Sequence, residues 1–176
     1  KLDPTIIVGS VVPYIGGNAH SGSGEFFLAE ACEYRRHFLN YSPEYLIITN
    51  MEWDHPDYFR DLNDVVSAFN ELAQKVPPVG HVFIWAEDPN RLKITSPAPI
   101  TTFGLSEAAD IRGVDIRFLN GGSTLTVLNK GVPIGELHLN VSGKHNILNA
   151  LAATAFCLEI GIPAETIFQA LSEFRG

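Results

Sequence analysis

The chain has 176 residues, 45% of them hydrophobic, and a formal net charge of −8 at pH 7. That length suits one domain with its own core, and no apolar run approaches the roughly 20 residues that a helix needs to cross a bilayer. The acidic charge argues against nonspecific binding of nucleic acid, because phosphates would be repelled. Cys32 and Cys157 are too few for a disulfide framework or a zinc site, and residues 1–30 lack a secretory pattern. We therefore expect a cytoplasmic domain with neither a membrane nor nucleic acid as partner.

Two short apolar runs near the N-terminus, residues 5–8 and 25–29, predict strands. Residues 9–24 between them are rich in glycine and serine, which predicts a loop. This loop is either a flexible surface segment or one whose backbone amides approach a diphosphate or a sugar. It is not a P-loop, since neither Gly-Lys-Ser nor Gly-Lys-Thr occurs in the chain. Residues 32–40 are mixed and basic, and they predict a helical turn with a solvated face.

The stretch at residues 49–59 is the richest in groups that carry chemistry. It follows an apolar strand at residues 45–48 and holds three acids, a histidine and an asparagine. In open α/β sheets such side chains gather where strands end, so the loop predicts a divalent-cation site that faces a phosphate. Glu30 also follows an apolar run, and if the two strands are neighbours in a parallel sheet, Glu30 and His55 can converge above it. The alternative is that His55 is an ordinary surface residue of an acidic loop.

The middle of the chain predicts one helix and one strand. Asp61 is placed to cap a helix over residues 61–74, which has one apolar face, and Pro77-Pro78 stops it. Residues 81–85 form the next strand. A plain turn is one explanation of its polar exit, residues 86–90.

Residues 100–141 change character. A strand at residues 100–104 is followed by three segments in which apolar and polar residues alternate with period two, at 115–118, 124–128 and 136–140. Tight turns at 120–122 and 129–131 make these segments an antiparallel meander with one wet face. We expect a small subsheet packed beside the main one, with no chemistry of its own.

Two helices complete the chain. A helix rich in small residues over 144–159 packs closely on the sheet and ends at Gly161. The last helix starts at Pro163 and is expected to bury the apolar side chains of Ile167, Phe168, Leu171 and Phe174. These elements together predict an α/β fold, with a mainly parallel central sheet flanked by helices and a small antiparallel subsheet.

Several phrases of the sequence resemble the Mur ligases, the ATP-dependent amino-acid ligases of peptidoglycan synthesis. They are EACEYRRHF at residues 30–38 and TNMEWDHPDYF at residues 49–59. Residues 143–150 match the family's GxHNxxNA helix start, and residues 16–19 and 174–176 extend the resemblance from end to end. The resemblance is to the central ATP-binding domain of such a ligase. It implies that residues 1–176 are that domain, lacking the P-loop and the N- and C-terminal domains.

The resemblance also implies a reaction and two sets of residues that bind ATP and metal. The branch that the chain resembles most joins L-alanine to UDP-N-acetylmuramate through an acyl phosphate, which requires positioning and charge neutralisation. Glu30 and His55 would be catalytic as the two ligands of a divalent cation, Mg²⁺ or Mn²⁺, since carboxylate suits Mg²⁺ and imidazole suits Mn²⁺ better. His145, Asn146 and Asn149 would bind the adenine or ribose of ATP. Helix capping is the alternative for these three.

The resemblance also implies a set of residues that contact the nucleotide-sugar. The sequence departs from the family pattern at two places. The expected substrate-contacting residues are Asn18, Ala19, His20 and Gly22. Relatives often carry arginine where His20 stands, so a phosphate contact there depends on protonation. Residues 61–74 hold no lysine where other branches carry a carbamylated one, which favours the alanine-adding branch. In related ligases the acidic turn at Asp88-Pro89 lies beside the nucleotide.

Three alternatives stay open. A ligase that recycles murein tripeptide shares the EACE-like and DH-like motifs, a noncatalytic module would bind nucleotide-sugar or a partner, and a simple metal-binding or scaffold domain would bind no UDP-sugar. The P-loop expected before Lys1 and the amino-acid-binding domain expected after Gly176 are not in this sequence. We therefore expect the chain alone to neither hydrolyse ATP nor ligate alanine.

Overall fold

The computed structural model describes residues 2–119 and 121–175. They form two compact units, one ending at Phe38 and one running from Leu39 to Arg175. Each unit is built on a sheet of its own. Among the described residues, no helix is both long enough and apolar enough to cross a membrane.

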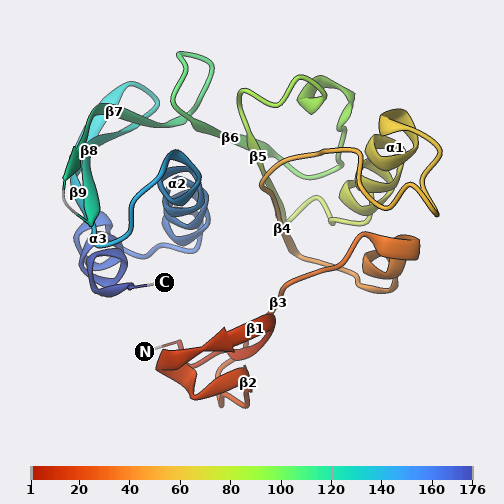
Figure 1. The fold of residues 1–176 in the computed structure, drawn as a ribbon, viewed down its shortest axis with the longest axis horizontal. Helices are drawn as coiled ribbons and strands as arrows, with labels where there is room; N and C mark the ends of the chain where they lie inside the picture. The colour runs from red at the N-terminus through yellow and green to blue at the C-terminus, as the bar shows by residue number, and fades with distance from the viewer. Residues whose placement is uncertain (1, 120, 176) are drawn as a thin grey trace. The chain divides into compact units, whose positions relative to one another are not determined.

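The first unit is a three-stranded sheet in the order β2-β1-β3 (Figure 1). Its strands are β1 (Thr5–Val12), β2 (Gly17–His20) and β3 (Phe27–Ala29). β2 returns antiparallel to β1 after the 3-10 turn η1 (Pro13–Ile15), and β3 lies parallel to β1. Two predictions are corrected here, since β1 extends beyond residue 8 and Gly17–His20, expected in a loop, form a strand. Pairing with β1 orders this segment, whose small and polar side chains carry no strand pattern.

The predicted shared sheet under Glu30 and His55 is wrong. The strand before Glu30, β3, pairs with β1, whereas the strand before His55 pairs with β5 in the other sheet. The backbone explains the choice, because the Thr5 amide donates to the Phe26 carbonyl and the Glu30 amide donates to the Ile7 carbonyl, each at 2.9 Å. β1 therefore supplies the partner that sequence reasoning had assigned to the main sheet.

The second unit is a six-stranded sheet in the order β4-β5-β6-β7-β8-β9. Its strands are β4 (Tyr45–Ile48), β5 (His81–Trp85), β6 (Ile100–Gly104), β7 (Ile111–Leu119), β8 (Gly122–Asn129) and β9 (Val132–Leu139). The pairs from β4 to β7 are parallel, and the pairs β7-β8 and β8-β9 are antiparallel. β4 is apolar along its whole length, and β5 is apolar after His81, because both faces of a parallel sheet are covered. The predicted α/β fold with a mainly parallel sheet is confirmed.

The antiparallel meander continues the main sheet, which corrects the expectation of a separate subsheet beside it. The joint is the short parallel pairing of β6 with β7, at Phe103 opposite Ile111 and Gly104 opposite Arg112. The predicted alternation is confirmed, since the core-facing side chains of β8 and β9 are Leu125, Val127, Leu137 and Leu139. Lys130 and Gly131 link these two strands with φ of 49° and 82°, as a two-residue type I′ turn requires. Asn120, in the other predicted turn, lies outside the described residues.

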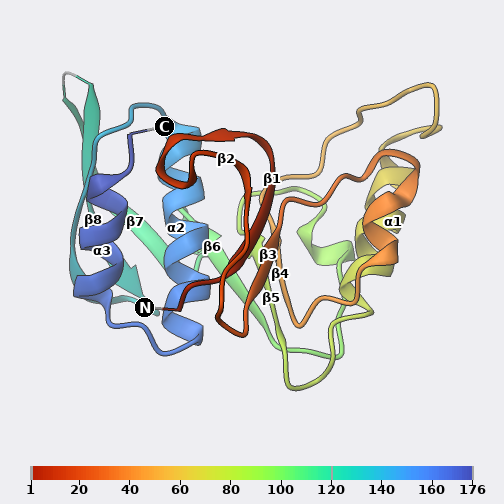
Figure 2. The same cartoon turned by 90° about the horizontal axis from the view of Figure 1, so that it is seen from below.

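Helices cover both faces of the second sheet (Figures 1 and 2). α2 (Lys144–Glu159) and α3 (Ala164–Glu173) pack on one face, and α1 (Leu62–Ala73) lies on the other. Shorter 3-10 turns are η2 (Tyr34–Asn40) and η3 (Arg91–Lys93). The predicted cap is confirmed, because the Asp61 carboxylate accepts from the Asp64 amide at 2.9 Å. Phe174 was expected to be buried, but it follows the end of α3 and is 50% exposed.

A buried histidine fixes the direction of α2. His81 opens β5, and its Nδ1 lies 3.2 Å from Glu159 Oε1 at the end of α2, while Nε2 lies 2.7 Å from Thr101 Oγ1 on β6. The last turn of α2 is thereby held at the amino ends of the parallel strands. The helix start, residues 144–146, consequently lies toward their carboxyl ends, where ligand sites of open sheets gather.

Candidate functional site

The loop after β4 is held in one shape by its own buried and hydrogen-bonded residues. Met51 and Phe59 are buried at its two ends. The Trp53 indole N–H donates to the Phe59 carbonyl at 3.0 Å. The amides of Tyr58 and Phe59 both donate to the His55 carbonyl at 2.9 Å. The loop thus presents its polar side chains from a fixed backbone.

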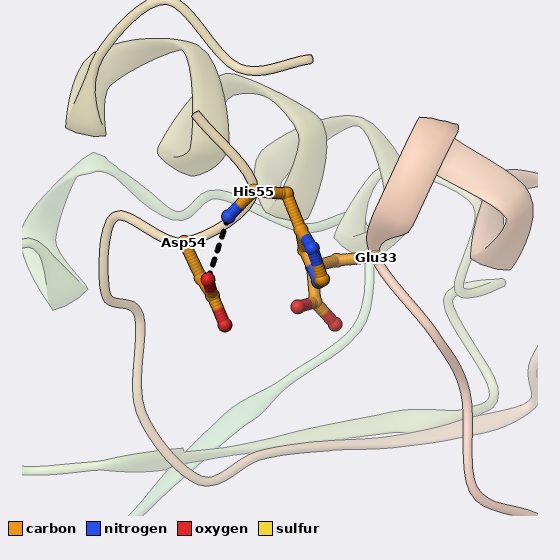
Figure 3. Close-up of side chains that lie close together, drawn as sticks. All are labelled: Glu33, Asp54 and His55. Atoms are coloured by element: carbon orange, nitrogen blue, oxygen red, sulfur yellow. Dashed lines mark hydrogen bonds between the residues drawn. The ribbon is translucent and has the colours of Figure 1, made fainter. Parts of the chain in front are cut away.

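His55 occupies the tightest point of this loop. Its backbone is left-handed, with φ of 53°, a conformation uncommon for residues other than glycine. Its amide donates to Asp54 Oδ1 at 2.7 Å, as the dashed line in Figure 3 shows. Because the bonds on both sides of His55 fix the turn, the imidazole leaves the backbone in a defined direction. The Asp54 carboxylate and the His55 imidazole, whose ligand atoms lie within 4.8 Å of one another, are the donor types that a divalent cation takes.

Asp88 braces this loop from the neighbouring strand. Its side chain is only 3% exposed. Oδ2 accepts from the Met51 amide at 2.8 Å, and Oδ1 accepts from the Asn90 amide at 2.7 Å. Asp88, for which a plain turn was one of two interpretations, thus ties the exits of β4 and β5 together. Its only sequence signal is an acid placed directly after a buried strand.

Glu87, the preceding residue, closes the exit of β6. Its Oε1 accepts from the Leu105 amide at 2.6 Å and also from the Ser106 amide. Burial alone would raise the pKa of Glu87, but the hydrogen bonds from the Ser106 and Leu105 amides outweigh it and lower the pKa below its ordinary value. Oε2 is buried and has no hydrogen-bond partner among the described residues. A Cβ on Gly104 would stand 2.2 Å from that oxygen, so any larger residue there would displace the Glu87 carboxylate.

Glu30, in the first unit, presents an exposed carboxylate at the end of β3. Its Oε2 accepts from the Gly9 amide on β1 at 2.6 Å, and within the described residues Oε1 has no such bond. One oxygen therefore orients the group while the other remains available, which fits a hard cation such as Mg²⁺. Glu30 belongs to the first unit and His55 to the second, so their sharing of one metal stays a prediction.

The four expected substrate residues all lie in the first unit. Asn18 and Ala19 are exposed on β2, and His20 ends that strand with Nε2 3.4 Å from Asp3 Oδ1. The Gly22 amide donates to Thr5 Oγ1 at 3.2 Å. In this structure that amide therefore bonds within the chain. Contact of these residues with a nucleotide-sugar stays a prediction.

Asp3 holds the same segment against the N-terminus. Its Oδ2 accepts from the Ser23 amide at 2.9 Å and from the Ser23 hydroxyl at 2.7 Å. The bonds from Ser23, with a smaller contribution from His20, lower the pKa of Asp3 to about 2. The carboxylate is therefore ionised at neutral pH and fixes the turn around residues 21–24.

A cavity of about 260 Å³ opens beside the start of α2. It is lined by Leu139, Val141, Asn146, Asn149, Ala150, Leu171 and Phe174. Two of the three residues expected to bind the nucleotide, Asn146 and Asn149, thus meet at one cavity. The third does not line it, because the His145 ring packs over Gly143. An apolar hollow with two amide side chains is suited to a flat heteroaromatic base.

The Asn146 amide is already oriented. Its Nδ2 donates to the Ser142 carbonyl one turn earlier, at 2.7 Å, which leaves Oδ1 as an acceptor. The Asn149 side chain has no hydrogen-bond partner in the part of the chain that the structure describes. The cavity can therefore offer one fixed acceptor and one adaptable amide, a donor and acceptor set that matches an adenine edge.

Comparisons of the sequence and of the structure with known proteins all find Mur ligases. Residues 13–157 match the family model of the Mur ligase middle domain. The UDP-N-acetylmuramate–L-alanine ligase of Desulfitobacterium hafniense is 65% identical over 99% of this chain, and the chain spans 39% of that protein's length. A Thermotoga maritima UDP-N-acetylmuramate–alanine ligase superposes with a TM-score of 0.86 at 29% identity, over 99% of this chain and 39% of that one. A ligase from Neisseria meningitides for the alanyl-glutamyl-diaminopimelate peptide shares the fold, with a TM-score of 0.82 at 24% identity over 99% of this chain and 58% of that one.

Proposed function

The chain belongs to the Mur ligase family, and from this premise we propose that residues 1–176 are the central, ATP-binding domain of a longer cytoplasmic ligase that joins L-alanine to UDP-N-acetylmuramate. The identity with the Desulfitobacterium ligase across nearly the whole chain carries this proposal. The P-loop and the N- and C-terminal domains lie outside these residues. This domain supplies the surface on which ATP and the muramate carboxylate meet.

The reaction has two steps. A carboxylate oxygen of the muramate lactyl group attacks the γ-phosphorus of ATP, which gives an acyl phosphate and ADP. The amine of L-alanine then attacks the acyl carbon, the amide forms, and phosphate leaves with the acyl C–O bond pair. Both steps depend on positioning and on neutralising negative charge, so the protein must hold two anionic substrates close together.

The residues of this chain divide these tasks. Glu30 and His55 would hold Mg²⁺ or Mn²⁺, and the cation would offset phosphate charge. The bond from the Gly9 amide orients Glu30, and the tight turn orients His55. Asn146 and Asn149 hold the adenine, with Asn146 Oδ1 as acceptor for the 6-amino group, and His145 lies nearby at the helix start. Asn18, Ala19, His20 and Gly22 face the nucleotide-sugar.

Turnover by the full-length protein tests the proposal. ATP, Mg²⁺, UDP-N-acetylmuramate and L-alanine should give the amide and one phosphate per amide. Glu30→Gln removes a charged ligand and should abolish the Mg²⁺-dependent rate, whereas Glu25→Gln, an exposed acid five positions earlier along the same segment, should not change it. A tripeptide acceptor preferred over L-alanine would indicate a recycling ligase instead. Binding of UDP-N-acetylmuramate without turnover on either acceptor would indicate a noncatalytic module.

A further inference from the structure

Two segments that are about 30 residues apart in the sequence make the apolar wall of the cavity beside α2. One is the exit of β9, with Leu139 and Val141, and the other is the end of α3, with Leu171 and Phe174. The polar wall is the first turn and a half of α2. Neither Leu171 nor Phe174 lies in a motif that sequence reasoning connected with a ligand.

Phe174 is unusual among the lining residues. It is half exposed, and it sits immediately after α3, where its amide donates to the Leu171 carbonyl at 3.3 Å. A large aromatic side chain left half exposed at the mouth of a cavity keeps apolar area available for a ligand. Aromatic rings gain most from flat π-systems, which stack on them in offset or edge-to-face arrangements.

One hydrogen bond joins the two segments of this wall. The Asn140 side-chain amide donates to the Ser172 carbonyl. Asn140 stands between Leu139 and Val141 in the sequence, and Ser172 stands between Leu171 and Phe174. The bond therefore spans the cavity wall and sets the distance between its two apolar parts.

We propose that Phe174 is a base-contacting residue of the nucleotide site, and that Asn140 is a positioning residue that holds Phe174 against the purine. This inference rests on the proposed function, since it assigns ATP to the cavity at Asn146 and Asn149. Phe174 supplies a ring for stacking or edge contact. Asn140 acts only through the bond to Ser172 and touches no substrate.

Calorimetric titration of the full-length protein with the nonhydrolysable analogue AMP-PNP tests the role of Phe174. Phe174→Ala should weaken binding about fivefold or more, because a base–aromatic stack is worth about 1–3 kcal/mol and about 1.4 kcal/mol is a factor of ten. Phe174→Trp keeps a ring and should bind within about threefold of the natural protein. Phe118→Ala removes another exposed phenylalanine, 61% exposed on β7, and should change nothing. Natural affinity in a folded Phe174→Ala protein would overturn the assignment.

Asn140→Ala tests the positioning. It should raise the KM for ATP severalfold with kcat unchanged, and speed amide exchange at residues 171–174. In the Phe174→Ala background the same change should add almost no further loss, since the ring to be positioned is gone. Asn129→Ala, at the end of β8 in the same sheet, is the matched control. Fully additive losses would show that Asn140 does not act through Phe174.

The two proposals can fail separately. If the natural protein does not bind AMP-PNP, the proposed function and this inference both fall. If the natural protein binds AMP-PNP, and Asn149→Ala weakens this binding while Phe174→Ala does not, the nucleotide site is supported and the role assigned to Phe174 is wrong.

Discussion

His55 holds a backbone conformation that side chains other than glycine seldom adopt. Two amides bond to its carbonyl and its own amide bonds to Asp54, so the surrounding loop enforces the turn. Backbone strain of this kind costs on the order of 1–3 kcal/mol and persists only where neighbouring contacts impose it. The strain fixes the direction of the one imidazole in the loop, which is the property a metal ligand needs.

His55→Asn separates the backbone role of this residue from its ligand role. Asparagine tolerates left-handed backbone, so the free energy of unfolding should stay within about 0.5 kcal/mol of the natural value. Mn²⁺ affinity of the full-length protein should fall by at least about tenfold, as losses around metal ligands do. Urea unfolding and a Mn²⁺ titration measure the two effects. His138→Asn, an exposed histidine on β9, is the control, and unchanged Mn²⁺ affinity in His55→Asn would contradict the assignment.

Asp3 makes the turn at residues 21–24 sensitive to acid. Its pKa in the folded chain is about 2, below the ordinary value of 3.8, because the Ser23 hydroxyl and amide and His20 bond to the carboxylate. A lowered pKa means that the charged form is favoured by folding. The ionised Asp3 carboxylate therefore stabilises the turn fully above about pH 4, and this stabilisation is lost as the pH falls from there toward 2. Protection of the Ser23 amide in hydrogen exchange should drop across that window. In the Asp3→Asn protein, protection of the same amide should already be low at pH 6. A pH-independent difference between the two proteins would contradict this.

At the scale of elements, the exits of β4, β5 and β6 are tied by two consecutive acids on β5's exit. Asp88 bonds backward to the loop after β4, and Glu87 bonds forward to the loop after β6. The two residues stand in the turn after β5, where the Asp88 amide donates to the Trp85 carbonyl at 3.2 Å, and from this turn their carboxylates reach the loops on either side. These bonds hold the carboxyl edge of the sheet, where His55 stands.

Asp88→Ala should destabilise the second unit by about 2–4 kcal/mol, because it leaves the buried amides of Met51 and Asn90 without an acceptor. Asp88→Asn keeps one acceptor oxygen and should cost about half as much. The free energy of unfolding in urea measures both. Asp115→Asn, at an exposed position with positive φ, should change it by less than about 0.5 kcal/mol. Equal free energies of unfolding for Asp88→Ala and Asp115→Asn would contradict the stabilising role assigned to Asp88.

Elements whose structure depends on the pattern of side chains could be predicted from the sequence. Elements whose structure depends on backbone pairing between distant residues could not. The continuous apolar runs of β4 and β5, the alternation of β8 and β9 and the Asp61 cap all follow from side-chain chemistry, and all are found. β2 was missed because residues 17–20 carry no apolar pattern and gain their order by pairing with β1. The shared sheet was wrong for a similar reason, since the partner of β3 is chosen by backbone bonds between distant residues.

The candidate site divides in the same way. Asn146 and Asn149 are one turn of a helix apart, so their meeting at one cavity follows from helical spacing. Phe174 was expected in the core because apolar spacing continued past the last turn of α3, but the helix ends at Glu173. Asn140 gave no signal at all. Its bond to the Ser172 carbonyl joins residues 32 positions apart, which no local pattern encodes.

Across the whole second unit, one apolar core joins the parallel and antiparallel parts. It contains Phe83 and Phe103 from parallel strands, Leu125 and Leu137 from the meander, and Leu151 from α2 between them. Among the described residues, the strands of the two parts join only through the short pairing of β6 with β7. Burial against α2 is therefore what makes the two parts one cooperative body.

Leu151→Ala tests that cooperativity. The side chain is fully buried, so the change should cost about 2–5 kcal/mol. Amide exchange should accelerate by a similar factor in β5 and in β8, because both unfold with the same core. Leu92→Ala, at a position 79% exposed, should leave exchange unchanged. Acceleration confined to β8 would mean that the meander opens independently.

Gly104 and Glu87 restrict each other's evolution. Because a methyl group at position 104 would meet the carboxylate of Glu87, alanine there should be deleterious alone and become acceptable once residue 87 is shortened, for example to serine. A double-mutant cycle on unfolding free energy should show favourable coupling above about 1 kcal/mol, and additivity would contradict it. Position 104 can then change only after position 87 has been shortened, so one turn of this sheet edge constrains which mutational paths remain open to the lineage.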